Sequence, residues 1–98
     1  MLSCTWNYFY VVAPKLKELM RELSAKAADW ERIGIELEID DGDLKQIKSN
    51  NPLDNCKCLI EMFRKWLTQV SPEPTWAAIA DAVEHIGDKE LARRLRSK

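Results

Sequence analysis

Residues 51–70, NPLDNCKCLIEMFRKWLTQV, carry the strongest structural signal in the chain. Their apolar side chains recur at steps of three and four residues, the spacing of one face of an α-helix, at Leu53, Cys56, Ile60, Phe63, Leu67 and Val70. The same stripe is widened by Leu59, Met62 and Trp66. We expect a helix with so wide an apolar face to lie at the centre of the molecule.

The start of this helix is predicted by Asn51 and Pro52. Asparagine is a favoured N-cap residue, and proline suits the first helical position because the N–H it lacks would have no helical partner there. Asp54 would then lie in the first turn, beside the positive end of the helix dipole.

Two helices are predicted at the N-terminal end. The first runs from Pro14 to about Lys26, with an apolar face of Leu16, Leu19, Met20 and Leu23. The second follows Asp29 as its cap, and one face carries Trp30, Ile33 and Leu37. Gly34 lies inside this second helix, where glycine costs about 1 kcal/mol relative to alanine. We therefore expect a neighbouring helix to approach closely at Gly34.

Three more helices complete the pattern. A short one is capped by Asp40 or Asp41 and turns Leu44 and Ile47 inward. Residues 71–74, Ser-Pro-Glu-Pro, end the long central helix, and Thr75 caps the next one. That helix turns inward Trp76, Ile79, Ala80, Val83 and Ile86. Gly87 ends it, and Asp88 caps a last helix with an inner face of Leu91, Ala92 and Leu95.

Six helices with short connections predict an all-α fold, a six-helix antiparallel bundle. A chain of 98 residues corresponds to one domain. We expect that domain over residues 14–98, with residues 1–13 as an N-terminal extension or linker. The apolar run 6–12 is either a short extended segment packed on the domain or the end of an upstream region. The predicted core is Leu19, Leu23, Trp30, Ile33, Leu37, Leu44, Ile47, Ile60, Phe63, Trp66, Leu67, Trp76, Ile79, Val83, Leu91 and Leu95.

The order and spacing of these core residues resemble the death domain, a branch of the death-fold superfamily. The resemblance extends from about Pro14 to Arg96. It is carried by Trp30, Ile33, Gly34, Leu37 and Ile39, then Leu44 and Ile47, then Leu59, Met62, Trp66 and Leu67, then Thr75, Trp76, Ile79 and Ala82, and finally Leu91, Ala92 and Leu95. Trp66 together with Thr75-Trp76 favours the death domain over the caspase-recruitment, death-effector and pyrin branches.

This resemblance implies a module that recruits other death-fold domains into apoptotic or innate-immune signalling assemblies. Such a module belongs to a larger receptor or adaptor. The resemblance also implies heterologous contacts, in which the first and fourth helices of one domain meet the second and third helices of the next, so that subunits can add helically.

Charged residues in this sequence are divided between the same two pairs of helices, the second and third against the first and fourth. Residues 29–43 hold seven acidic residues and only one basic residue, Arg32. The predicted acidic face is Glu31, Glu36, Glu38, Asp40, Asp41 and Asp43. The predicted basic face, on the first and fourth helices, is Lys15, Lys17, Arg21, Lys57, Arg64 and Lys65. We interpret them as complementary halves of a salt-sensitive homotypic or heterotypic contact, with solvated faces of no function as the alternative.

The remaining motifs do not indicate a catalytic, metal-binding or cofactor-binding site. Cys56 and Cys58 are too close in sequence for a zinc knuckle, and a second ligand pair is missing. The apolar stripe predicts that Cys56 is buried and Cys58 marginal. The three cysteines are an odd set, and we interpret them as reduced thiols of a cytoplasmic protein. With His85 as the single histidine and no glycine-rich phosphate loop, we expect no catalytic residues, no metal and no cofactor.

The alternative function is a small helical nucleic-acid-binding domain. The net charge of −1 and the acidic segment oppose it, because both would repel phosphate. The basic end at residues 93–98 is explained more simply by cations at a helix C-terminus. No run reaches the roughly 18 apolar residues of a membrane span, so membrane insertion is not expected.

Overall fold

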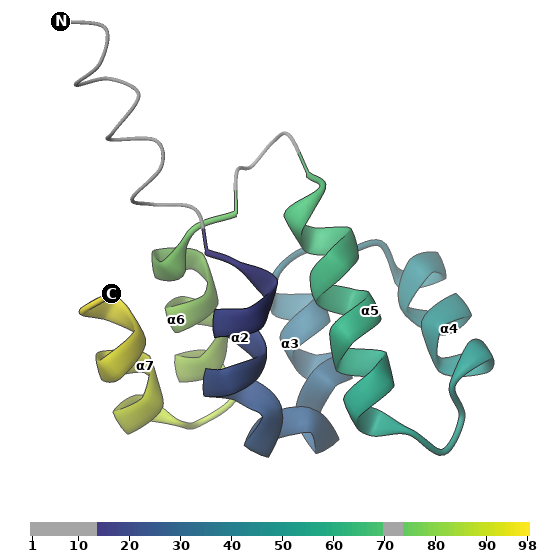
Figure 1. The fold of residues 1–98 in the computed structure, drawn as a ribbon, viewed down its shortest axis with the longest axis horizontal. Helices are drawn as coiled ribbons and strands as arrows, with labels where there is room; N and C mark the ends of the chain where they lie inside the picture. Colours follow the sequence, from purple (N-terminus) through teal and green to yellow (C-terminus); the bar gives the residue numbers. More distant parts are fainter. Residues whose placement is uncertain (1–13, 70–73) are drawn as a thin grey trace, which may run out of the picture.

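The computed structural model describes residues 14–69 and 74–98, and every regular element in these two ranges is helical (Figure 1). The elements are α2 (Leu16–Leu23), the 3-10 helix η1 (Ser24–Asp29), α3 (Trp30–Glu36), α4 (Asp41–Asn50), α5 (Asn55–Leu67), α6 (Trp76–His85) and α7 (Lys89–Arg96). The all-α class is confirmed. The predictions for residues 1–13, for Val70 and for residues 71–73 lie outside the described residues.

Helix α5 organises one half of the bundle, as its apolar stripe predicts. It packs against α2, η1, α3 and α4, whereas α6 packs against α7 and α3 (Figure 1). Leu59, Met62 and Phe63 are fully buried, and the rings of Phe63 and Trp66 lie 6.3 Å apart at a tilt of 50°. Aromatic rings prefer such tilted contacts to face-to-face stacking.

The predicted start of α5 is wrong by three residues. The helix begins at Asn55, and Asp54 is the cap, because its carboxylate accepts a hydrogen bond of 3.0 Å from the Lys57 N–H. Asn51 is buried instead. Its amide donates to the Ile47 carbonyl at 3.1 Å and to Glu61 at 2.9 Å, which ties the end of α4 to α5.

The inner face of α5 is also displaced from the predicted stripe. Cys58 is buried and Cys56 exposed, the reverse of the prediction, and Leu53 is 98% exposed in the turn before the helix. The buried residues of α5 are 58, 59, 62, 63 and 66, so its inner face is centred on the residues that widen the predicted stripe and not on the line from Leu53 to Leu67. Ile60 and Leu67 fall at its margins and are half-buried, while the other predicted core residues are buried.

The first predicted helix is divided in two. Pro14 is buried but precedes α2, which ends at Leu23, and the chain continues as η1. Lys26 departs from helical geometry, with φ −101° and ψ 17°. Residues 24–28 contain only small side chains apart from Lys26, and these tighter turns place Ala27 in the core. Asp29 precedes α3 as predicted, but its side chain makes no capping bond.

The prediction at Gly34 is confirmed. A Cβ atom there would lie 2.6 Å from a terminal methyl carbon of Leu44 and 3.4 Å from Cγ of Met62. Helices α4 and α5 therefore approach α3 as closely as glycine allows. The caps predicted at Thr75 and Asp88 are confirmed as well, and Asp40 is the cap of α4 out of the two candidates Asp40 and Asp41. Each of these side chains accepts an N–H of the first turn that follows.

Candidate interaction surfaces

The acidic face extends from the first turn of α3, where Glu31 lies, through the end of α3 and the turn that follows it to the first turn of α4. Glu36, Glu38, Asp40 and Asp41 are exposed there, whereas Glu31 and Asp43 are half-buried. Asp40 and its neighbours gather at this corner because α3 ends abruptly and α4 begins only five residues later.

The turn that ends α3 is a Schellman motif with an unusual residue. The Glu38 N–H donates to the Ile35 carbonyl at 3.0 Å, and the Ile39 N–H donates to the Gly34 carbonyl at 3.0 Å. Glu38 takes φ of 63°, the left-handed conformation that glycine normally supplies. Helix α6 ends with the same two bonds, and there Gly87 occupies the equivalent position with φ of 108°.

Several charges of the acidic face are already paired within the chain. Lys48 lies 3.9 Å from Glu31, Lys45 lies 3.2 Å from Asp41, Lys65 lies 3.4 Å from Asp43 and His85 lies 2.7 Å from Glu36. Among the described residues, Glu38 and Asp40 make no ion pair, and Asp40 is engaged as the cap of α4. Within the described ranges, Glu38 is therefore the one carboxylate of the acidic face that neither forms an ion pair nor caps a helix.

The basic face lies on α2 and α5, which pack side by side (Figure 1). All six predicted residues are exposed. Lys65 belongs elsewhere, because its pairing with Asp43 places it on the side of α5 that faces α4. The other five form no ion pair within the described ranges: Lys15, Lys17, Arg21, Lys57 and Arg64.

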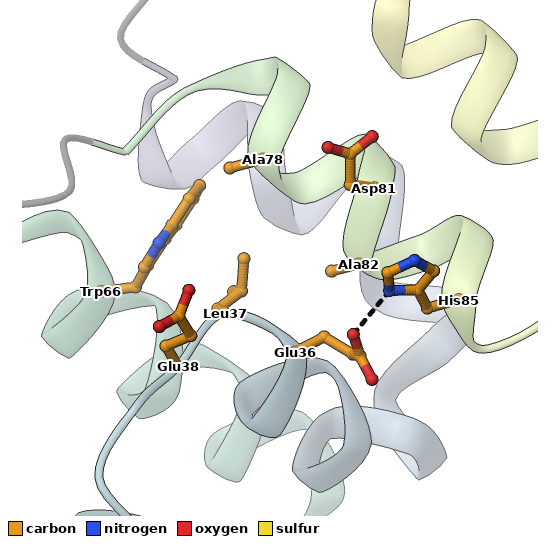
Figure 2. Close-up of a pocket in the computed structure, with 8 residues that line it drawn as sticks. All are labelled: Glu36, Leu37, Glu38, Trp66, Ala78, Asp81, Ala82 and His85. Carbon is orange, nitrogen blue, oxygen red and sulfur yellow. Dashed lines mark hydrogen bonds and ion pairs between the residues drawn. The ribbon is translucent and has the colours of Figure 1, made fainter.

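A pocket of about 250 Å³ adjoins the acidic face, between the end of α3, the C-terminal part of α5, and α6 (Figure 2). Apolar groups from three elements line it, namely Leu37, Trp66, Ala78 and Ala82. Its polar lining is Glu36, Glu38, Asp81 and His85. The sequence alone did not indicate Asp81 or His85, because both belong to α6 and only the packing of α6 on α3 brings them here.

His85 joins α3 to α6 at the edge of this pocket (Figure 2). Its Nδ1 lies 2.7 Å from Glu36 Oε1, and this hydrogen bond, followed by the Coulomb attraction of the same carboxylate, raises the pKa of His85 above its ordinary value. Asp81 pairs with Arg96 at 2.7 Å, and the same guanidinium also binds Glu84.

The two cysteines of α5 differ in their surroundings. The Cys58 thiol donates to the Asn51 carbonyl at 3.2 Å, and burial raises its pKa. Among the residues that the structure describes, no three His, Cys, Asp or Glu side chains are arranged to hold a metal ion. Over the same residues, no helix is long and apolar enough to cross a membrane.

The death-domain family model matches residues 14–98, nearly the whole chain. The chain therefore belongs to the death-domain family. Death domains are non-catalytic protein-protein interaction modules of apoptotic and immune signalling, and they bind other death-fold domains, either of the same kind or of another. No curated protein and no solved structure matches the chain.

Proposed function

We propose that this death domain assembles head to tail, with the acidic face of one subunit against the basic face of the next. The partner is a second copy of the chain or a related death-fold domain. The role that follows is recruitment within a cytoplasmic receptor or adaptor of apoptotic or innate-immune signalling, without catalysis.

The observation that carries this proposal is the presence of both charge signs, exposed, on different helices of one small domain. The five basic residues of α2 and α5 have no ion-pair partner within the described residues. Such charges remain available to an external acidic surface. Contacts of this kind chiefly set specificity and association rate, and salt screens them over about 8 Å at physiological ionic strength.

The experiment is size-exclusion chromatography with light scattering across protein concentration, at low and at high salt. We expect oligomers that grow with concentration and dissociate in high salt. A monomer under every condition would refute the self-association. Oligomers of unchanged mass at high salt would refute the charged faces as their basis.

A further inference from the structure

We propose that the pocket between α3, α5 and α6 receives one arginine side chain from the basic face of a second copy of this chain. This inference rests on the proposed head-to-tail association and specifies one of its contacts. The arginine would come from α2 or α5 of the neighbouring subunit, where Arg21 and Arg64 are exposed.

The size of the pocket fits a side chain. Its volume of about 250 Å³ is below the roughly 300–1,000 Å³ typical of sites for drug-sized ligands. Its apolar wall consists of Leu37, Trp66, Ala78 and Ala82 (Figure 2). The methylene stem of an arginine can lie along such a wall while its charged end stays near water.

The charge of the pocket fits a cation. Carboxylates enter it from α3, from the turn after α3 and from α6. Two of them have a partner in the same chain, Glu36 with His85 and Asp81 with Arg96. Glu38 has none among the described residues, so it is the group that a cation from outside would bind first.

The backbone at Glu38 gives a separate reason to look for a role. The left-handed conformation strains an ordinary residue, and Gly87 avoids this strain at the matching position of α6. A carboxylate kept at such a position is therefore not explained by the stability of the turn. Binding of a cation at the pocket explains it.

Arginine fits better than lysine for geometric reasons. The guanidinium presents several N–H donors in a planar fork, matches a carboxylate with two parallel hydrogen bonds and is more weakly hydrated than an ammonium group. The chain itself contains an example, because Arg96 binds Asp81 and Glu84 together.

The source of the arginine is argued from charge complementarity within one molecule. Arg21 and Arg64 lie on the face that the proposed association brings to the acidic side of a neighbour. Both are exposed, and neither pairs with a carboxylate in residues 14–69 or 74–98. A second copy therefore supplies the required group without any further component.

The test isolates one contact by using two full-length chains. The acceptor chain carries Arg64→Glu, which blocks its basic face, and the donor chain carries Asp41→Lys, which blocks its acidic face outside the pocket. Their affinity is measured by titration calorimetry at fixed salt. Into the acceptor we introduce Glu38→Gln, with Glu90→Gln as the matched control that removes one exposed acidic charge on α7, away from the pocket and the acidic face. Into the donor we introduce Arg21→Lys together with Arg64→Lys, which keeps the charge.

We expect Glu38→Gln to weaken binding about tenfold or more, as the loss of a charge-assisted hydrogen bond should, and Glu90→Gln to weaken it by about threefold at most. The arginine-to-lysine donor should also bind about tenfold more weakly. Glu38→Gly in the acceptor should lose the same affinity while its fold is retained, which separates binding from folding.

Equal effects of Glu38→Gln and Glu90→Gln, with no effect of the lysine substitutions, would overturn the arginine pocket and leave the head-to-tail association standing. If the Asp41→Lys donor and the Arg64→Glu acceptor do not bind each other even without these further substitutions, the proposed function is overturned instead.

Discussion

Glu38 combines a strained backbone with a carboxylate that has no ion-pair partner in residues 14–69 and 74–98. The hydrogen bonds of its turn are the same as those around Gly87, so the two positions can be compared directly. The two positions differ in their side chains. The effect of this difference on the free energy of unfolding can be measured without any binding partner.

Replacement of Glu38 by glycine should therefore stabilise the domain. Relief of the left-handed conformation gains about 1–2 kcal/mol, and the greater freedom of glycine in the unfolded chain returns about 0.5–1 kcal/mol of that gain. We expect a net increase of about 0.5–1 kcal/mol in the free energy of unfolding, measured with urea. Gly87→Ala is the matched control and should destabilise, although open space surrounds its Cβ position. A loss of stability in Glu38→Gly would contradict the assignment of strain.

Gly34 is a second residue whose identity is set by its neighbours. Gly34→Ala should lower the free energy of unfolding by about 1 kcal/mol, because overpacking of the core outweighs the better helix propensity of alanine. Leu44 supplies the obstructing methyl carbon at 2.6 Å. In a Leu44→Val background that atom is absent, so the same substitution should cost nothing or stabilise. An equal loss in both backgrounds, seen in denaturant unfolding, would show that Leu44 is not the cause.

At the scale of helices, the caps at Asp40, Thr75 and Asp88 could be predicted because a local side chain meets a local N–H. The start of α5 could not. Asn51 followed by Pro52 is a strong local signal, yet the amide of Asn51 is used by Ile47 and Glu61. A tertiary hydrogen bond overrides the local preference here. The inner face of α5 is likewise set by its neighbours: Cys58, whose thiol donates to the Asn51 carbonyl, enters the core, and Cys56 is exposed.

Asn51→Asp distinguishes the two roles of this residue. Aspartate would serve as well as asparagine if Asn51 were a helix cap. In the observed structure it removes the donor and places a carboxylate against Glu61, so we expect a loss of about 1–3 kcal/mol in unfolding free energy. Wild-type stability in this variant would restore Asn51 as the cap. Asp54→Ala is the companion variant and should cost about 1 kcal/mol.

The contact between α3 and α6 through His85 and Glu36 predicts a dependence of stability on pH. The pKa of His85 is raised in the folded protein, so its contribution is fully present below the unfolded pKa of about 6.5 and is lost as pH rises through the folded pKa. Glu36 faces the ring from α3, Asp81 and Glu84 flank it on α6, and Arg96 of α7 binds the latter two.

Urea unfolding of the wild type and of His85→Ala, at about pH 5 and about pH 9, measures this contribution. We expect the wild type to be the more stable protein at the lower pH and the two to converge at the higher pH. Glu36→Gln should remove the same difference. A difference that is the same at both pH values would mean that packing of the ring, and not its charge, joins the helices.

At the scale of the molecule, the exposure of most of these charged side chains could be predicted from the sequence, because charged groups stay in water unless they are paired. The pocket could not be predicted. Glu36 and His85 are 49 residues apart and meet only because α6 packs on α3. For the same reason, the sequence pattern assigns Lys65 to the basic face, whereas in the structure Lys65 of α5 pairs with Asp43 of α4.

The central claim is that the acidic and basic faces bind each other in a head-to-tail arrangement. Light scattering of two charge-reversed chains, alone and mixed, tests it most directly. Arg64→Glu keeps the acidic face and Asp41→Lys keeps the basic face, so each variant alone should be a monomer. Mixed in equal amounts, they should form a particle with the mass of two chains that does not grow with concentration. If either variant alone assembles like the wild type, or if the mixture remains monomeric, the claim is contradicted.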